Sequence, residues 1–316
     1  MPLIGNSGLD AYPLSLGGNT FGWTTDEERS FAVLDAYAAA GGNFVDTADS
    51  YSAWIPGHSG GESETIIGAW MNARGHRDQV IVATKVSQHP QFRGLKAANV
   101  TAACEASLAR LGTDRIDLYY AHYDDASTPL EETVAAFGEL QRAGKVRYVG
   151  VSNYTGARLR KWIAAARDGG WPLPVALQPH YNLVARQPYE AELAPVVAQY
   201  DLGVAPYYAL AAGFLTGKYR TPEDLRGPAR GQAAGRYFSP AGLEVVAAMD
   251  QVAAAHGVHL ASVAIAWLLA RPGIVAPIAS ATSAAQLADL ITGATVKLAA
   301  DEVTALGDAS APVAEG

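Results

Sequence analysis

The sequence predicts a closed (β/α)8 TIM barrel, and two observations carry this prediction. Short apolar segments alternate with amphipathic segments along the 316 residues, which indicates a parallel sheet covered by helices. Eight such units can be counted, and eight parallel strands are the number that closes into this barrel. Barrels of this class commonly reach about 250 residues as one domain, so we expect a single domain over residues 1–316.

The expected strands are short apolar runs bounded by turn residues. In chain order they are Pro13–Leu16, Asn43–Thr47, Val80–Val86, Ile116–His122, Val146–Val151, Val175–Gln178, Gly203–Tyr207 and Ile274–Ile278. Two helix starts carry capping-box spacing, Thr25 to Glu28 and Thr128 to Glu131, and Pro129 stands at the first helical position of the second.

Two long loops interrupt the alternation of strands and helices. Ser52–Gly61 follows the second expected strand, and Thr216–Pro240 follows the seventh. In such a barrel the loops that leave the C-terminal strand ends build the active site. Each loop is therefore either a pocket wall or lid, or a tolerated surface insertion, and the sequence leaves both interpretations open.

Composition and charge exclude several classes of function. The net charge is −8 and no block of Lys and Arg occurs, so nucleic acid is not an expected partner. The single cysteine, Cys104, excludes an intrachain disulfide and a cysteine-based metal site, and we expect no metal. It shares a helical face with Val100, Leu108 and Leu111, which predicts a buried side chain rather than a nucleophile. Met1–Asp10 lacks signal-peptide features and no apolar run could span a membrane, so we expect a cytoplasmic protein.

Four ionisable residues are expected at neighbouring C-terminal strand ends: Asp46, Tyr51, Lys85 and His122. A tyrosine has a pKa of about 10, and a nearby ammonium group such as Lys85 would lower this pKa. Asp46 would keep Lys85 protonated, and His122 would hold a substrate oxygen as a neutral donor. Asp46 and Lys85 also fit a structural ion pair and His122 a core histidine, but so many polar groups on one rim favour carbonyl chemistry.

In this order and on these strands, the four residues resemble the catalytic tetrad of the aldo-keto reductases. The likeness covers nearly the whole chain: SGLDAYPLSLGGNTFG resembles the family's N-terminal hairpin and first strand, VRYVGVSNYT its fifth, LQPHYNLVAR its sixth and APYYALAAGFLTGKY its seventh. The resemblance implies a barrel with an N-terminal β-hairpin at its bottom. It further implies reduction of an aldehyde or ketone to the alcohol by NADPH, with Tyr51 as the general acid.

The same resemblance implies which residues hold the cofactor, and Asp46 belongs to this set as well as to the tetrad. Ser152, Asn153 and Gln178 would hold the nicotinamide carboxamide, since they offer both donors and acceptors. Tyr207 would stack on the nicotinamide ring. The remaining implied contacts are Gly18 and Asn19 along the ribose, and Leu210, Gly213 and Lys218 along the pyrophosphate. No GxGxxG motif stands in a Rossmann setting, so an extended cofactor across the barrel mouth is expected.

The segment PIASATSAAQLADL resembles the family's adenosine-phosphate site, but it lacks the Arg or Lys that commonly pairs with the 2′-phosphate. Ser280 and Thr282 at a helix start would bind a phosphate through hydroxyl and backbone groups. Gln286 fits a cap for Ser283, a cofactor contact, or both. Charge could come instead from the preceding long loop, which contains Arg226, Arg230 and Arg236. We expect NADPH as the preferred cofactor, with NADH as an open alternative.

Aromatic residues near the expected site predict a pocket suited to apolar or aromatic aldehydes. They are Phe21, Trp23, Trp54, Tyr123 and Tyr208. Two other functions stay open. The resemblance also takes in channel β subunits that keep the cofactor site but serve mainly as partners. An unrelated barrel lyase would need a Schiff-base lysine or metal ligands, and Lys85 with its Asp partner is the only support for it. The sequence specifies neither the substrate, nor the physiological direction, nor the oligomeric state.

Overall fold

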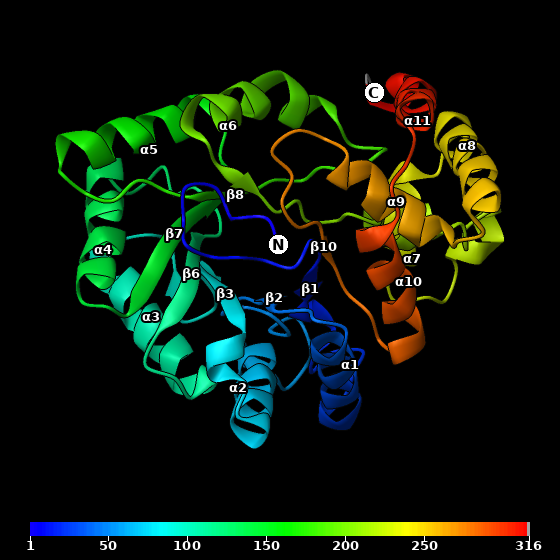
Figure 1. The fold of residues 1–316 in the computed structure, drawn as a ribbon. Coiled ribbons are helices and arrows are strands. Elements are labelled where there is room, and N and C mark those ends of the chain that lie inside the picture. Colours follow the sequence, from blue (N-terminus) through cyan, green and yellow to red (C-terminus); the bar gives the residue numbers. More distant parts are fainter. Residues whose placement is uncertain (315–316) are drawn as a thin grey trace.

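A computed structural model, which describes residues 1–314, shows eight parallel strands curled into a barrel and surrounded by helices (Figure 1). The sheet order is β10 (Ile278–Ala279), β1 (Ser15–Gly17), β2 (Phe44–Asp46), β3 (Ile81–Val86), β6 (Ile116–Ala121), β7 (Val146–Ser152), β8 (Ala176–Gln178) and β9 (Gly203–Val204). A parallel bridge between Val204 and Ile274 joins the two ends of this order, and Val275 N donates to Val204 O at 2.9 Å. The predicted (β/α)8 barrel is confirmed.

The eighth strand differs from its prediction. Ile274–Ile278 was expected as a continuous strand, but β10 is Ile278–Ala279 and Ile274 makes only the isolated bridge. Pro277 and, on the facing segment, Pro206 have no amide hydrogen to donate to a ladder. The ladder is therefore reduced where these two prolines stand, and the Pro206 carbonyl accepts a hydrogen bond from Ile278 N at 2.9 Å.

The main helices are α1 (Glu27–Ala39), α2 (Glu62–Arg74), α3 (Ala97–Leu111), α4 (Leu130–Arg142), α5 (Gly156–Asp168), α6 (Ala194–Tyr200), α8 (Pro240–His256), α9 (Leu260–Leu269), α10 (Ala284–Thr295) and α11 (Ala300–Ala314). Both expected capping boxes are wrong. Asp26 caps α1 by accepting from Arg29 N, because its carboxylate suits the positive end of the helix better than the hydroxyl of Thr25. Pro129 precedes α4, and the Thr128 hydroxyl donates to Asp125 instead.

The N-terminal segment lies across the end of the barrel that faces the viewer in Figure 1. It forms one antiparallel bridge, Leu3 to Asp10, with Ile4 N donating to Leu9 O at 3.0 Å. The expected β-hairpin is thus reduced to a single bridge within the described residues. Gly5 has a φ of 52°, and a Cβ there would come within 2.6 Å of Gly203 N, so the turn packs directly on the start of β9.

The core has two layers, one inside the barrel and one between the sheet and the helices. Strands that are buried on both faces explain the continuous apolar runs in the sequence. Cys104 belongs to the outer layer, fully buried with Val100, Leu108 and Leu111 beside it in the same cluster. Burial raises the pKa of its thiol to about 12, so the structural interpretation of Cys104 is confirmed.

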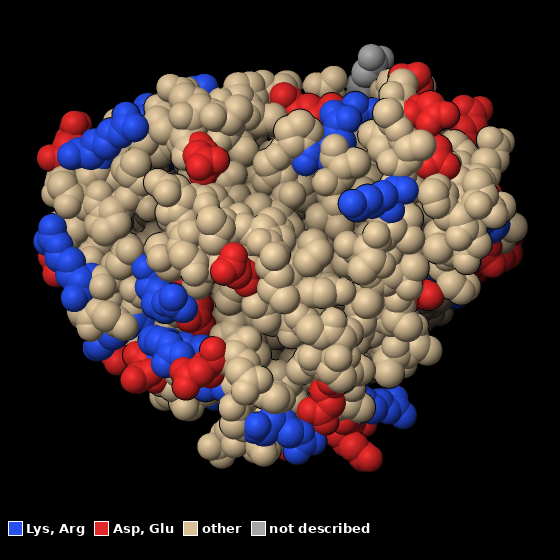
Figure 2. Space-filling model, in the orientation of Figure 1, with Lys and Arg blue, Asp and Glu red and all other residues tan. Residues whose placement is uncertain are grey.

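Two surface properties bear on possible partners. On the face shown in Figure 2, side chains of both charges are interspersed near the edge and neither sign gathers into an extended patch. Within residues 1–314, no single helix has the length and apolar character needed to cross a membrane. The pair α8 and α9 meets that criterion only when joined, and it is bent by 95°.

Candidate active site

A cavity of about 840 Å³ lies where the strands end at their C-termini. Residues at the ends of β2, β6 and β8 form its floor, namely Asp46, His122 and Gln178. The position follows from the fold, because parallel strands bring all their carboxyl ends to the same face of the barrel.

Lys85 is the centre of the polar contacts beneath the cavity. Its ammonium group donates to Asp46 Oδ2 at 2.7 Å, to the Thr47 carbonyl at 2.6 Å and to Tyr51 Oη at 3.0 Å. Three acceptors match the three hydrogens of a protonated lysine. The side chains of Lys85 and Asp46 are both buried, so this contact is an ion pair in the protein interior.

The pKa of Tyr51 is shifted upward, contrary to the expected lowering by Lys85. Burial, followed by the negative charge of Asp46, raises the pKa of Tyr51 well above its ordinary value. Burial and the charge of Asp46 outweigh the pull of the Lys85 ammonium toward the phenolate, because Asp46 at 2.7 Å balances much of the charge of Lys85. Tyr51 consequently keeps its proton throughout the neutral range, as a proton donor must.

His122 lies beside Tyr51, with 6.3 Å between the ring centroids. Burial, and then the positive charge of Lys85, lowers the pKa of His122 well below its ordinary value. The imidazole is therefore neutral near pH 7. Its Nδ1 finds no hydrogen-bond partner in the part of the chain that the structure describes. A neutral imidazole can donate one hydrogen bond into the cavity.

A chain of hydrogen bonds connects the floor of the cavity to its wall. Gln178 Nε2 donates to Asp46 Oδ1 at 2.8 Å. Asn153 has a φ of 55°, and it donates to the His122 carbonyl at 2.9 Å while its Oδ1 accepts from Tyr207 Oη at 2.7 Å. The amides of Gln178 and Asn153 are thus fixed in orientation and both line the cavity.

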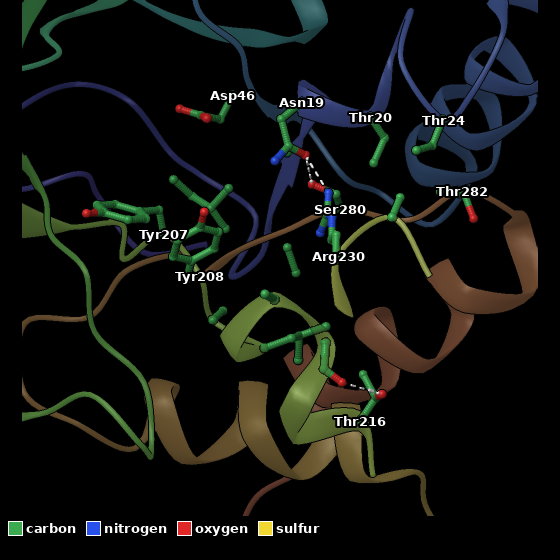
Figure 3. A pocket seen from close by; sticks show the side chains of 18 of the residues that line it. Asn19, Thr20, Thr24, Asp46, Tyr207, Tyr208, Thr216, Arg230, Ser280 and Thr282 are labelled. Atoms are coloured by element: carbon green, nitrogen blue, oxygen red, sulfur yellow. Dashed lines mark hydrogen bonds between the residues drawn. The ribbon is translucent and has the colours of Figure 1, made fainter. Parts of the chain in front are cut away.

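The 216–240 loop forms one wall of the cavity, and a side-chain hydrogen bond joins it to the turn after β1. Arg230 Nη2 donates to Asn19 Oδ1 at 3.0 Å, and Ser280 Oγ donates to the same oxygen at 2.7 Å (Figure 3). Pro228 and Arg236 of the loop also line the cavity, whereas Arg226 is exposed and does not. The lining interpretation of this loop is therefore the one that the geometry supports.

The cavity contains positive charges that the protein itself does not neutralise. Lys218, Arg230 and Arg236 line it, and no ion pair among residues 1–314 involves any of them. Burial, followed by the charge of Arg230, lowers the pKa of Lys218. Gly213 has a φ of 93°, and a Cβ there would stand 3.1 Å from Lys218 Nζ, so glycine leaves room for this lysine. Such an arrangement suits an anionic ligand such as a dinucleotide.

The end of the cavity near β10 contains the segment expected at the adenosine phosphate. Ser280, Thr282 and Gln286 all line the cavity. Ser283 caps α10 by accepting from Gln286 N. Gln286 Oε1 accepts from both the backbone and the hydroxyl of Thr282, at 3.0 Å each. Gln286 therefore closes the helix start and stands at the cavity wall at the same time.

Five residues expected at the site do not line the cavity: Gly18, Phe21, Trp23, Ser152 and Lys85, the last of which lies beneath it. Phe21 is 0% exposed and packs in the outer core, so the substrate contact expected for it is a misassignment. The Gly18 carbonyl accepts from Ser63 Oγ at 2.8 Å behind the wall, while Asn19 reaches the cavity. Ser152 is buried, and its hydroxyl donates a hydrogen bond to the Gln178 carbonyl at 2.8 Å.

Aromatic side chains surround the mouth of the cavity. Trp54, Tyr123 and Tyr208 line it and are the exposed aromatics of the site, with Trp54 50% exposed. Through Trp54 the 52–61 loop forms part of the cavity wall. The ring of Trp54 packs edge to face against that of Trp23, with 5.5 Å between the ring centroids. Tyr208 has a φ of 56°, an uncommon conformation that turns its side chain at this position. Leu210 lines the cavity on the same side.

The sequence interpretation missed His180. Its ring stacks on Tyr207 at 5.4 Å with an interplanar angle of 16°, and its Nε2 lies 2.9 Å from Tyr237 Oη. One face of Tyr207 is therefore covered by His180. The sequence feature that could have identified His180 is its position two residues after Gln178, where an expected strand ends. Among the described residues, no group of three His, Cys, Asp or Glu side chains could hold a metal ion.

Comparison with known proteins agrees with this geometry. The family model described as Aldo/keto reductase family matches residues 13–311. A probable voltage-gated potassium channel subunit beta from Oryza sativa subsp. japonica is 34% identical over 296 residues, which is 90% of this chain and 88% of that protein. The uncharacterized oxidoreductase YrpG from Bacillus subtilis is 34% identical over 315 residues, covering 96% and 94%. Norsolorinic acid reductase B from Aspergillus parasiticus is 32% identical over 318 residues, covering 94% and 80%.

Proposed function

The chain belongs to the aldo/keto reductase family, a family of oxidoreductases, and we propose that it reduces an aldehyde or ketone to the alcohol with NADPH. One observation carries this proposal. The phenol of Tyr51 lies 3.0 Å from the ammonium of Lys85, beside a neutral imidazole and under a cavity lined with cations. A protonated phenol and a neutral imidazole that face the same space are the groups needed to polarise and protonate a carbonyl oxygen.

In the proposed reaction Tyr51 gives its proton to the substrate oxygen. The bound reduced nicotinamide would supply the hydride to the carbonyl carbon. His122 would donate a hydrogen bond to the same oxygen and fix its direction. Lys85 stabilises the phenolate that remains on Tyr51, which then regains a proton from solvent. Asp46 holds Lys85 in place at 2.7 Å and is itself held by Gln178 at 2.8 Å.

The cations of the cavity support NADPH over NADH. Arg230 meets Ser280 at Asn19, beside the segment that lacks a basic residue of its own. A 2′-phosphate carries roughly −1.5 to −2 charges, and one charge-assisted hydrogen bond contributes about 1.5 to 3 kcal/mol. We infer that Arg230 supplies part of this charge from the loop, with Ser280 and Thr282 contributing hydroxyl and backbone donors. Asn153 and Gln178 would hold the carboxamide, and Tyr207 would stack on the nicotinamide ring through the face that His180 leaves uncovered.

The aromatic mouth supports an apolar or aromatic substrate. Trp54, Tyr123 and Tyr208 would cover a flat or apolar group once its carbonyl reaches Tyr51. Small polar aldehydes would leave these rings in water and would bind less well.

The test is a panel of aromatic aldehydes, aliphatic aldehydes, ketones and sugars, followed by loss of absorbance from the reduced nicotinamide. Wild type should turn over aromatic aldehydes with NADPH, and Tyr51→Phe should lower kcat by about 100-fold or more, because it deletes the acid and keeps the ring. NADPH binding should stay within a few-fold of wild type. A Tyr51→Phe variant that turns over like wild type would remove Tyr51 from the role of donor.

A second candidate function comes from the relatives named as channel subunits. In that case the chain would bind the cofactor and act mainly as an interaction partner with little turnover. The same panel separates the two proposals. Tight NADPH binding without turnover of any carbonyl compound would favour the interaction protein, whereas turnover that depends on Tyr51 favours the reductase.

A further inference from the structure

A second cavity of about 430 Å³ lies between α6 and the C-terminal end of α9, where β9 begins. Its lining includes Tyr181, Tyr189, Val197, Leu202, Arg271 and Gly273. Within the described chain it shares no lining residue with the active-site cavity. The carbonyl chemistry proposed above does not use it.

Arg271 carries a charge that its neighbours only partly balance. Glu190, the nearest carboxylate, is already engaged by Arg186 through two hydrogen bonds of 2.9 and 3.0 Å and by the Tyr181 hydroxyl at 2.7 Å. Arg271 Nη2 lies 3.6 Å from Glu190, and its guanidinium lies 5.3 Å from the centroid of the Trp267 ring. The Nε of Arg271 is buried and has no hydrogen-bond partner in residues 1–314.

Arg186 is held in its contact with Glu190, so this carboxylate is not free to pair fully with Arg271. Arg186 also donates to the Gly307 carbonyl and to Ser310 Oγ of α11, at 2.7 Å each, so its position is fixed by two elements. The other acidic residue of the lining, Asp201, is exposed at the rim. Arg271 is therefore the donor that the cavity can offer to a ligand.

Tyr189 also lines this cavity and carries a second possible donor. Its side chain is 2% exposed, and its hydroxyl finds no partner in the described part of the chain. Burial raises the pKa of this phenol to about 12, so it holds its proton. A Cβ on Gly273 would stand 3.9 Å from the hydroxyl, which places it next to a cavity wall. Burying an unsatisfied hydroxyl costs free energy, and Tyr189 opens a π-helical turn, Tyr189–Leu193, a conformation frequent at functional sites.

We propose that this second cavity binds a small organic carboxylate, which accepts hydrogen bonds from the Arg271 guanidinium and the Tyr189 hydroxyl. A guanidinium and a phenol offer hydrogens to the two oxygens of a carboxylate, and buried charge-assisted hydrogen bonds are strong. Val197 and Leu202 form apolar walls against which a hydrocarbon or aromatic body packs. Inorganic phosphate suits the site less well, because these walls offer no further donors for its remaining oxygens.

The experiment uses benzoate as the probe and benzamide as its neutral match, with binding followed by calorimetry on the whole protein. Benzoate should bind wild type with a Kd on the order of a millimolar, and benzamide about 10-fold more weakly. Tyr189→Phe should weaken benzoate about 3- to 10-fold, and Arg271→Gln about 10-fold or more. Tyr154→Phe is the control, since it removes another buried hydroxyl that lacks a partner in the described residues, and it should bind benzoate like wild type.

Folding is checked separately for each variant. Tyr189→Phe should keep or raise Tm without benzoate, because the deleted hydroxyl is buried and makes no hydrogen bond in residues 1–314. Arg271→Gln loses the contact of the guanidinium with the Trp267 ring and could fail to fold for that reason. In that case the benzoate affinity of Tyr189→Phe tests the proposal by itself. Absence of benzoate binding would overturn the proposal. Benzoate binding that is as tight in Tyr189→Phe as in wild type would also overturn it. Benzoate that competes with a carbonyl substrate equally in wild type and in Tyr189→Phe would do the same, since the anion would then sit in the active site.

Discussion

Arg230 Nη2 lies 3.0 Å from Asn19 Oδ1, across a separation of 211 positions in the sequence. This contact joins the 216–240 loop to the turn after β1 at the wall of the active-site cavity (Figure 3). It also positions a half-buried cation beside the β10 segment, which has no basic residue of its own.

The first prediction is that Arg230→Ala weakens NADPH binding about 10-fold and NADH binding less. The variant loses one charge-assisted contact to the 2′-phosphate, worth about 1.5 to 3 kcal/mol when fully formed. Titration of both cofactors by tryptophan fluorescence measures the two changes. Arg226→Ala is the matched control, because Arg226 belongs to the same loop but is exposed and off the cavity. Equal losses for both cofactors would contradict a role at the 2′-phosphate.

The second prediction adds the charge that the β10 segment lacks. Thr282→Arg should strengthen NADPH binding more than NADH binding, by roughly 10-fold in their ratio, and the gain should shrink as salt rises. Thr282→Gln controls for loss of the hydroxyl that donates to Gln286 at 3.0 Å. The same titrations test the preference of wild type. NADH that binds wild type at least as tightly as NADPH would refute the proposed preference.

The third prediction concerns Lys85 and the acidity of Tyr51. Lys85→Met should lower kcat by about 100-fold and move the alkaline limb of the pH profile upward, because removing the cation raises the pKa of Tyr51 further. The substitution also leaves Asp46 buried without its counter-charge. The double variant Asp46→Asn/Lys85→Met separates the two effects. Recovery of activity in the double variant would show that the unpaired Asp46, and not the missing ammonium, caused the loss.

The fourth prediction uses Asp125, which lies in the loop between β6 and α4. Partial burial opposes its ionisation, yet hydrogen bonds from Ser127, Leu95 and Thr128 lower the pKa of Asp125 to about 2. A lowered pKa contributes stability above the unfolded value of about 3.9, and this stability is lost as pH falls through the folded value. The group is only partly buried and solvent screens its contacts, so Asp125→Asn should cost about 1 kcal/mol at pH 7. Thermal unfolding at pH 7 and near pH 2 should show the difference in Tm vanish at the lower pH.

The sequence predicted the barrel and the convergence of Asp46, Lys85 and His122, because both follow from regular rules. Alternation of strands and helices fixes the number of units, and the ends of parallel strands share one face. Contacts of Lys85 with Asp46 and Tyr51 then required only the correct strand positions. Most strand positions needed no more than the pattern of apolar runs.

What the sequence could not predict depends on side-chain direction and on burial. Phe21 stands close to the cavity in the chain, but its ring points into the core. The direction of the Tyr51 pKa shift depends on how deeply the phenol is buried, which no spacing reveals. His180 resembles an ordinary core histidine until Tyr207 is seen to stack on it. Arg230 reaches Asn19 through a loop whose path follows no periodic pattern.

The interrupted pairing between β9 and the segment before β10 makes one seam of the barrel weaker than the others. Val204 is its single bridged position, whereas β6 and β7 pair at five. Amide hydrogens along a seam with so few bonds exchange with solvent through small local openings, well before the rest of the sheet. Tyr207 and Ser280 of the active site follow this seam, and Leu202 and Gly273 of the second cavity precede it. Both cavities therefore adjoin the part of the barrel wall with the fewest paired positions.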